Sequence, residues 1–288
     1  MLEQITYQNN QELQDAQLTT IVNVASEIYQ SNGNKPIRIL DLATGPNGFN
    51  PVIVRNLIDR GIDYELVLSD ISPTHFRIGY ENLEQELSPE ELQKVKCVLA
   101  DSRDFKRNLT EVPLWGEGRK PLEEVLEDPR YQFLQTGYQD GQRTVDFTDG
   151  AFDLVIGNIP YGSINTGDYS DAIDESARVL KPSGYHIVDE MHVENVQSYG
   201  LRAWCTLKEM FGKPLREAYP TARRSLSAIS RARAKDLQEV SSKLDSVLTP
   251  VAVYSTTYVY DTEERIPEQT LQKGDLVKRA VFVHQKVD

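Results

Sequence analysis

Five short apolar segments, each ending in a polar residue, constrain this sequence more than any other feature. They read IRILDLATG from Ile37, YELVLSD from Tyr64, VKCVLAD from Val95, FDLVIGN from Phe152 and GYHIVDE from Gly184. Strands with continuous rather than alternating apolar residues are typical of a parallel sheet that is buried on both faces. Helical patterns lie between most of them, and crossovers between parallel strands are right-handed. The pattern therefore predicts a doubly wound α/β sheet with helices on both faces.

The 288 residues divide into an N-terminal helical segment and one α/β domain with two insertions. We expect a helix over residues 11–29, inside a segment of residues 1–36, and the α/β domain over residues 37–288. Residues 104–150 and 193–248 exceed an ordinary connection between elements. We expect both insertions to fold over the carboxyl edge of the sheet, where they either determine substrate specificity or are only additions to the fold.

Bulk properties exclude several classes of protein. A formal net charge of −13 argues against a surface that binds nucleic acid everywhere. The two cysteines, Cys97 and Cys205, are too few and too far apart for a zinc site or a disulfide framework. The N-terminus has no signal-peptide pattern, and no apolar run approaches the ~20 residues that cross a membrane. We therefore expect a cytoplasmic protein.

The loop after the first strand, DLATGPNG, is the first candidate binding feature. Small residues let a ligand approach the backbone, and the N-terminus of the following helix offers free N–H groups. A tight strand-to-helix turn would use the same residue types. The residues of this loop that we expect to contact a ligand are Asp41, Ala43, Gly45 and Gly48.

Polar residues at the ends of the next strands extend this feature into a series. In open α/β sheets, ligands bind outside the carboxyl ends of the strands, where the strand order reverses. Asp70 ends the second strand, where a carboxylate can accept both hydroxyls of a ribose. Its alternative role is a helix cap, for which Ser72 is at least as well placed. Asp101 and Ser102 follow the third strand, in position to meet an adenine edge, and Asn158 ends the fourth.

In this order the series resembles the class I S-adenosylmethionine-dependent methyltransferases. ILDLATGPNG is similar to their glycine loop, LVLSDISP to their ribose-binding segment, LADSRDF to their adenine-contacting segment, and ARVLKPSGYHIV to the helix, turn and fifth strand that follow. The resemblance covers residues 37–190. It implies a Rossmann-like seven-stranded sheet with an antiparallel last strand, and S-adenosyl-L-methionine as cofactor. The contacts that it implies are those of Asp41, Gly45 and Asp70 with methionine and ribose, of Asp101 with adenine, and of Ile71 next to Asp70.

Two positions of the glycine loop depart from this family. Ala43 and Asn47 stand where the family usually has glycine, and Asn47 would change how the loop meets the methionine carboxylate. The spacing of Ala43, Gly45 and Gly48 also matches a nicotinamide dinucleotide fingerprint. That interpretation replaces the glycine of the tight turn by alanine, and it leaves Asp41 and the NIPY tetrapeptide unexplained.

The tetrapeptide NIPY, residues 158–161, resembles the Asn-Pro-Pro-Tyr motif of methyltransferases that act on amino or amide nitrogens. Such a nitrogen is a poor nucleophile because its lone pair is delocalised. The Asn158 oxygen and a following backbone carbonyl can accept its N–H bonds and aim the lone pair at the methyl group. Pro160 stiffens the loop and Tyr161 offers a face for stacking. We predict Asn158, Pro160 and Tyr161 as catalytic residues, with Asn158 also facing the sulfonium. The alternative is a plain loop whose tyrosine packs on the core.

The methyl acceptor stays open between a nucleic-acid base, a protein and a small molecule. Residues 213–243 contain eight Lys or Arg and three Asp or Glu, which suits phosphate contacts. A solvated helix face explains this segment equally well, and the overall acidity favours a small molecule or a protein amide. Asp189, Glu190 and His192 after the fifth strand raise the question of a metal ion, and we expect none.

Other functions of the same fold also stay open. These are a small-molecule O- or C-methyltransferase and a non-catalytic module that keeps the cofactor site. An enzyme that transfers an aminopropyl group would be expected to have an acidic residue where Asn158 stands.

Overall fold

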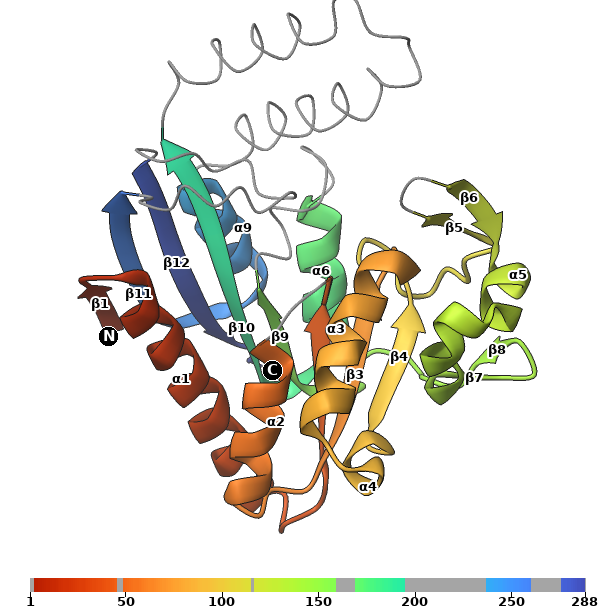
Figure 1. Ribbon diagram of the computed structural model, residues 1–288. Coiled ribbons are helices and arrows are strands. Elements are labelled where there is room, and N and C mark those ends of the chain that lie inside the picture. The colour runs from red at the N-terminus through yellow and green to blue at the C-terminus, as the bar shows by residue number, and fades with distance from the viewer. Residues whose placement is uncertain are drawn as a thin grey trace, which may run out of the picture.

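A single large sheet organises the computed structural model, which describes residues 3–45, 49–114, 117–158, 169–194, 237–259 and 276–287. Its strands are β1 (Glu3–Tyr7), β2 (Ile37–Leu42), β3 (Tyr64–Asp70), β4 (Val95–Leu99), β9 (Phe152–Asn158), β10 (Leu180–Glu194), β11 (Thr249–Val259) and β12 (Leu276–Gln285). They lie in the order β1-β11-β12-β10-β9-β2-β3-β4 (Figure 1). β12 is antiparallel to both of its neighbours, and the other neighbouring pairs are parallel. The predicted doubly wound sheet, with an antiparallel strand from the end of the chain, is confirmed.

The sheet has eight described strands, one more than the seven that we predicted. The additional strand is β1, which lies in the segment expected to be helical and pairs in parallel with β11, from Glu3 opposite Ala252 to Tyr7 opposite Thr256. Ile5 and Tyr7 are half-buried while the residues next to them are exposed, which is the period of a strand with one covered face. Five residues with this alternation are too few to stand out in the sequence beside the long helix that follows.

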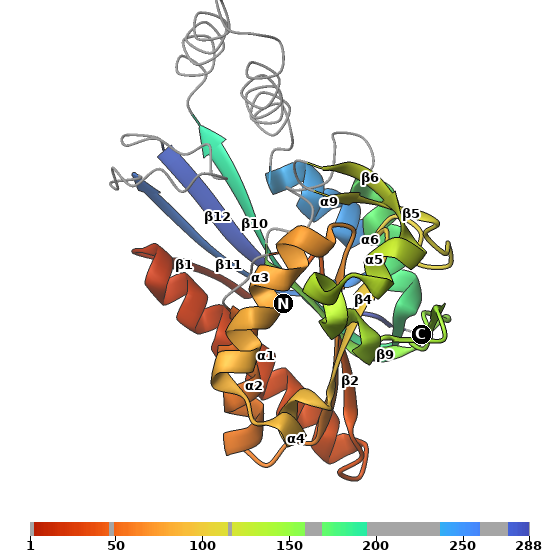
Figure 2. The same cartoon turned by 45° about the vertical axis from the view of Figure 1, so that its right-hand side comes forward.

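Helices cover both faces of the sheet. α1 (Asn10–Ser31), α2 (Phe49–Asp59) and α3 (Pro73–Glu86) lie side by side on one face. α6 (Tyr169–Val179) and α9 (Leu237–Val247) pack against each other on the opposite face (Figures 1 and 2). Side chains on both faces of the central strands are therefore buried, as the continuous apolar segments predicted.

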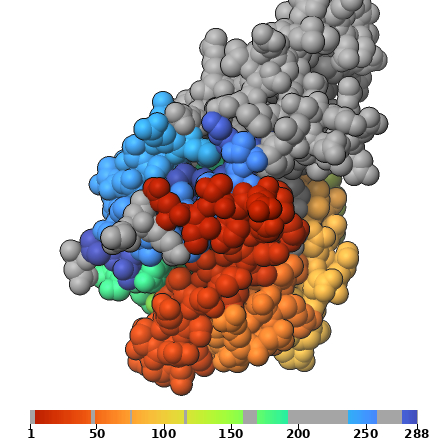
Figure 3. Space-filling view, turned by 90° about the vertical axis from the view of Figure 1, so that its left-hand side faces the viewer, coloured from red at the N-terminus to blue at the C-terminus, as the bar shows by residue number. Residues whose placement is uncertain are grey.

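The helix expected over residues 11–29 is α1. It begins after Asn9, whose side chain accepts a hydrogen bond from the Glu12 backbone N–H at 2.9 Å. Buried residues then recur at helical spacing, among them Leu13, Ile21 and Ile28. In Figure 3 the first residues of the chain and α1, in red, form the face of the molecule between the orange α2 and the blue C-terminal elements.

The insertion at residues 104–150 is described except for residues 115 and 116. Its elements are β5 (Glu111–Leu114), β6 (Gly118–Pro121), α5 (Leu122–Glu127), the 3₁₀ helix η1 (Pro129–Thr136), β7 (Tyr138–Gln139) and β8 (Gln142–Arg143). The segment of η1 and β7 runs along β4, the last strand of the sheet. The Cys97 N–H donates to the Thr136 hydroxyl at 2.9 Å, and the Tyr138 hydroxyl donates to the Leu99 carbonyl at 3.1 Å.

Much of this insertion therefore covers the open side of β4, whereas we expected it to fold over the carboxyl edge. The reason is that an uncovered edge strand leaves backbone N–H and C=O groups unpaired. The first part of the insertion does reach the carboxyl edge, where Leu109, Glu111 on β5 and Arg119 on β6 line a cavity together with Ile71.

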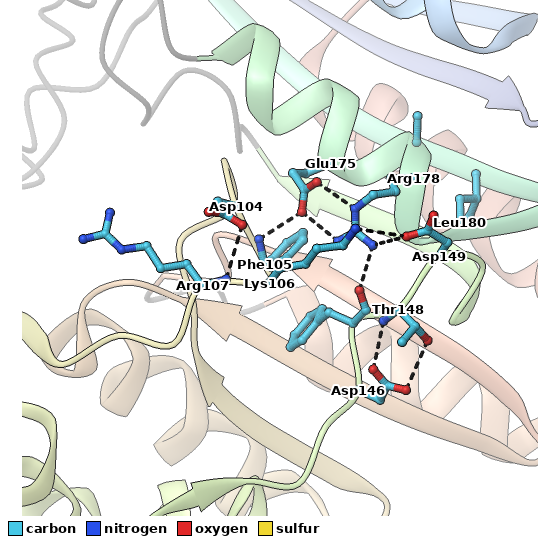
Figure 4. A network of polar contacts seen from close by, with 12 residues as sticks. Asp104, Phe105, Lys106, Arg107, Asp146, Thr148, Asp149, Glu175, Arg178 and Leu180 are labelled. Atoms are coloured by element: carbon cyan, nitrogen blue, oxygen red, sulfur yellow. Dashed lines mark hydrogen bonds and ion pairs between the residues drawn. The ribbon is translucent and has the colours of Figure 1, made fainter.

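Both ends of the insertion are attached to α6, as Figure 4 shows. Glu175 accepts a hydrogen bond from the Phe105 backbone N–H at 3.0 Å. Arg178 donates to the Phe147 carbonyl at 2.9 Å and to the Asp149 carboxylate at 2.7 Å. The rings of Phe105 and Phe147 stack with their centroids 4.6 Å apart. The insertion thus leaves and rejoins the sheet at fixed points.

The second insertion, expected over residues 193–248, is described only in part. β10 extends to Glu194, and α9 covers the face of the sheet beside α6, with Val240 and Leu244 buried. Residues 195–236, which include most of the basic segment, lie outside the described residues. Among the helices that are described, none combines the length and the hydropathy needed to cross a bilayer.

Candidate active site

The strand order places the candidate site between β2 and β9. From β2 the chain continues through α2 to β3 on one side, while β9 lies on the other side, so the strand order reverses at this point. This switch point is where ligands bind in Rossmann-like sheets. Asp41, Asp70, Asp101 and Asn158 all lie at or just beyond the carboxyl ends of these strands, which form the upper edge of the sheet in Figure 1.

Asp70 holds the loop after β2 in place. Its Oδ2 accepts the Gly45 backbone N–H at 2.9 Å, and its Oδ1 accepts the Ser72 backbone N–H at 2.7 Å. A third contact, from the Thr44 N–H to the Ser69 carbonyl at 2.9 Å, joins the same two segments. Ser72 precedes α3 without a side-chain capping bond, and Asp70 accepts the N–H of Ser72 itself rather than an N–H of the helix.

Two residues of this loop have left-handed backbone conformations. Gly45 has a φ of +54°, which glycine adopts without strain, and Ala43 has a φ of +49°. Alanine in this region costs about 1–2 kcal/mol relative to a helical or extended conformation. This explains why glycine would suit position 43. Gly48 and Asn47 lie outside the described residues.

Asp41 is a buried carboxylate, and its side chain faces an amide. It is 1% exposed, and its Oδ2 accepts a hydrogen bond from the Asn50 amide at 2.8 Å. Among the described residues no Lys, Arg or His forms an ion pair with it. Burial raises the pKa of Asp41 to about 7 against the opposing hydrogen bonds from Asn50 and Thr44, and the charge of Asp70 raises it further. Near neutral pH this site can thus gain or lose a proton.

We did not predict from the sequence that Asn50 would be part of the candidate site. It lies in the first turn of α2 and is 1% exposed. The available signal was a lone amide in the otherwise apolar stretch FNPVIV, because buried polar side chains are generally hydrogen-bonded.

Asp101 is engaged by a neighbouring arginine. Arg103 donates from Nε to Asp101 Oδ1 at 2.8 Å and from Nη2 to Asp101 Oδ2 at 2.6 Å. Burial raises the pKa of Asp101, but the hydrogen bonds and charge of Arg103 outweigh it, so this pKa lies below its ordinary value. Ser102 follows and is half-buried. Asp101 is therefore ionised near neutral pH.

A cavity of about 270 Å³ lies beyond the ends of β3 and β4. Ile71 forms part of its wall and is 36% exposed. The lining thus combines apolar, carboxylate and guanidinium groups. Its residues are Ile71, Asp101, Arg103, Arg107, Leu109, Thr110, Glu111 and Arg119.

Asn158 belongs to a partly buried polar network that the sequence did not reveal. Its Oδ1 accepts a hydrogen bond from Arg279 Nη2 at 3.4 Å. Arg279, on β12, also donates to Asn10 Oδ1 at 2.6 Å and forms an ion pair with Asp189, with Nε 3.2 Å from Oδ1. Burial lowers the pKa of Arg279 to about 10, so the arginine stays charged near neutral pH. The available signal was a single arginine inside the apolar strand KRAVFVHQ, since buried arginine requires a partner.

Asp189, a member of this network, is one of the three residues that we considered as metal ligands. Asp189 is already paired with Arg279. Within the described part of the chain, no three His, Cys, Asp or Glu side chains come together as a set that would hold a metal ion.

Of the residues predicted for the site, Pro160 and Tyr161 lie outside the described residues, as does Gly48. The remaining ones lie along one edge of the sheet. They are Asp41, Ala43, Gly45, Asp70, Ile71, Asp101, Ser102 and Asn158.

No protein-family model and no curated protein matches the chain, whereas solved structures do match it. The YcgJ protein of Bacillus subtilis is 11% identical over 95% of this chain and 99% of its own, with a TM-score of 0.49. An arsenic(III) S-adenosylmethionine methyltransferase of Chlamydomonas reinhardtii is 16% identical over 87% of this chain and 64% of its own, with a TM-score of 0.47. A phosphoethanolamine N-methyltransferase of Haemonchus contortus, solved with S-adenosyl-L-methionine, is 11% identical over 92% of this chain and 53% of its own, with a TM-score of 0.45. The likeness is one of fold.

Proposed function

We propose that this protein is an S-adenosylmethionine-dependent methyltransferase. The observation that carries the proposal is the series of polar side chains at the carboxyl ends of adjacent strands on both sides of the switch point. Asp41, Asp70 and Asp101 follow β2, β3 and β4, and Asn158 ends β9 across the reversal. A dinucleotide-binding role would leave Asp41 and Asn158 without a function.

The residues present fit S-adenosyl-L-methionine. Asp41 is a buried carboxylate without a cationic partner among the described residues, which suits the positive charge of the methionine part. Asp70 is a carboxylate at the end of β3 that accepts the Gly45 and Ser72 N–H groups, and a carboxylate in this place is the kind of group that accepts ribose hydroxyls. The exposed Ile71, on the wall of the cavity, gives an apolar surface on which a planar base can pack.

When bound, this cofactor supplies an electrophilic methyl group on a sulfonium. The contribution of the chain is then to hold the acceptor nitrogen in line with that group. The Asn158 oxygen has two lone pairs, of which Arg279 takes one, so the second can accept an N–H of the acceptor. No strong base is needed, because the acceptor proton becomes acidic once its nitrogen carries a positive charge. We propose that Pro160 and Tyr161 complete this part of the site.

Donor binding tests the proposal. Isothermal titration calorimetry with S-adenosylmethionine, S-adenosylhomocysteine and NAD separates a methyltransferase from a dinucleotide-binding protein. We expect the first two ligands to bind and NAD to show no heat. Binding of NAD alone would overturn the proposed function.

The acceptor is proposed to be an amino or amide nitrogen of a small molecule, a protein or a nucleic-acid base. The net charge of −13 ranks nucleic acid last. Transfer from methyl-labelled donor to RNA, protein and small-molecule extracts, tested as separate pools, assigns the class.

A further inference from the structure

A buried arginine on β12 connects three distant parts of the chain beside the predicted catalytic residue. Arg279 is 6% exposed and forms an ion pair with Asp189, which stands opposite Asn158 in the strand register. The remaining N–H groups of the guanidinium reach two amide oxygens, those of Asn10 and Asn158. Asp189 alone would neutralise the charge of Arg279. The contacts with the two amide oxygens are therefore not needed for charge balance, and their effect is on the orientation of the side chains.

The chemistry of the guanidinium determines which end of the Asn158 amide faces it. Arginine only donates hydrogen bonds, so an amide NH₂ group in the same place would leave two hydrogen-bond donors facing each other without an acceptor. The amide carbon is trigonal, and the NH₂ group of Asn158 therefore points away from Arg279. Without such a partner, the oxygen and nitrogen of an amide at a strand end exchange places at little cost, because the two groups have similar size.

We propose that Arg279 is a positioning residue that fixes the amide of Asn158 with its oxygen in one place. Asp189 and Asn10 hold the guanidinium for this purpose, and the start of α1 thereby becomes part of the acceptor site. This inference rests on the proposed function, in which the second lone pair of that oxygen accepts the N–H of the methyl acceptor.

Two variants remove the contact in different ways. Arg279→Lys keeps a positive charge for Asp189 but loses the planar fork that reaches both amides. The double variant Asp189→Leu/Arg279→Met replaces the buried ion pair by apolar side chains, a change that is often neutral for stability and so protects the test against unfolding. Arg178→Lys is the matched control, because Arg178 on α6 is 16% exposed and forms ion pairs with Asp149 and Glu175.

The first measurement needs no acceptor. The side-chain amide resonances of Asn158, identified by their loss in Asn158→Ala, should move toward those of a free amide in both Arg279 variants and stay in place in Arg178→Lys. The second measurement is single-turnover methyl transfer. Here we expect a roughly tenfold loss in both Arg279 variants, with unchanged donor affinity, because one hydrogen bond from a charged group is lost.

A double-mutant cycle separates positioning from general stability. When Asn158 is already Ala, Arg279→Lys should cause no further loss of transfer, since the group that it positions is gone. Unchanged Asn158 amide resonances in both Arg279 variants, or an equal loss of transfer with and without Asn158, would overturn the inference. If the wild-type protein transfers no methyl group, the proposed function fails, and the amide resonances alone decide whether Arg279 orients Asn158.

Discussion

Replacing Asp41 by Asn should make the stability of the ligand-free protein less dependent on pH. Burial raises the pKa of Asp41 in the folded chain from 3.8 to about 7. Between these two values the folded protein holds a proton that the unfolded chain has released, so the free energy of unfolding falls as the pH rises toward 7. Above that pH both states are ionised and the loss stays constant.

The size of this effect follows from the pKa. Each unit corresponds to about 1.4 kcal/mol, so the two units between about pH 5 and about pH 7 correspond to about 3 kcal/mol. The gain in unfolding free energy of Asp41→Asn over wild type should therefore be about 3 kcal/mol larger at pH 8 than at pH 5. The Asn50 amide can still donate to the new side chain, so the fold should be retained.

Urea denaturation of both proteins across this range measures the difference directly. Asp63→Asn is the control, because Asp63 is a 43% exposed carboxylate in a surface pair with Lys94 and should show a difference of less than about 1 kcal/mol at either pH. If the free energies of unfolding of Asp41→Asn and wild type differed by the same amount at every pH, the buried environment described for Asp41, without a cationic partner among the described residues, would be refuted. Donor affinity should also rise with pH through about 7 in wild type, and not in Asp41→Asn, because the cationic donor favours the ionised carboxylate.

Three further substitutions test the loop and the covered edge. Asp70→Asn should weaken donor binding about tenfold in calorimetry, because a ribose hydroxyl loses one of its acceptors; unchanged affinity in the folded variant would remove Asp70 from the cofactor site. Gly137→Ala should lower the free energy of unfolding by about 3 kcal/mol or more, because the new Cβ would lie 2.2 Å from the Cys97 carbonyl oxygen. Gly45→Ala should cost only about 1–2 kcal/mol for its left-handed backbone, since its Cβ would meet the Ala43 oxygen at 3.7 Å. Equal losses in the two glycine variants, measured by urea denaturation, would contradict the close packing of Gly137 on β4.

The sequence predicted the parts of the fold that depend on local pattern. Continuous apolar segments ending in Asp70 or Asn158 indicate buried parallel strands. The carboxyl ends of parallel strands lie at the same edge of the sheet, and ligands bind there where the strand order reverses. The short strand β1 was missed because its alternation spans only five residues and its partner, β11, lies about 250 positions away in the chain.

The buried polar contacts of the site were beyond sequence reasoning for a related reason. Arg279 contacts Asp189, Asn158 and Asn10 across sequence separations of 90, 121 and 269 residues. Their types and spacing do not identify these partners, which come together when β12 and β9 pair with β10 and α1 packs beside β12. The covered edge of β4 was missed likewise, because nothing in the 3₁₀ segment shows that Thr136 will reach a strand N–H.

The central claim is that the strand ends of this sheet hold a methyl donor and place an acceptor nitrogen against Asn158. Methyl transfer from labelled S-adenosylmethionine, compared between wild type and Asn158→Ala on the pool of RNA, protein or small molecules that gains label, tests it most directly. We expect the variant to bind the donor nearly as well as wild type and to transfer the methyl group roughly 10²-fold more slowly, because a pre-organised polar group is lost. A variant that transfers at the wild-type rate, or a wild-type protein that labels none of the three pools, would contradict the account.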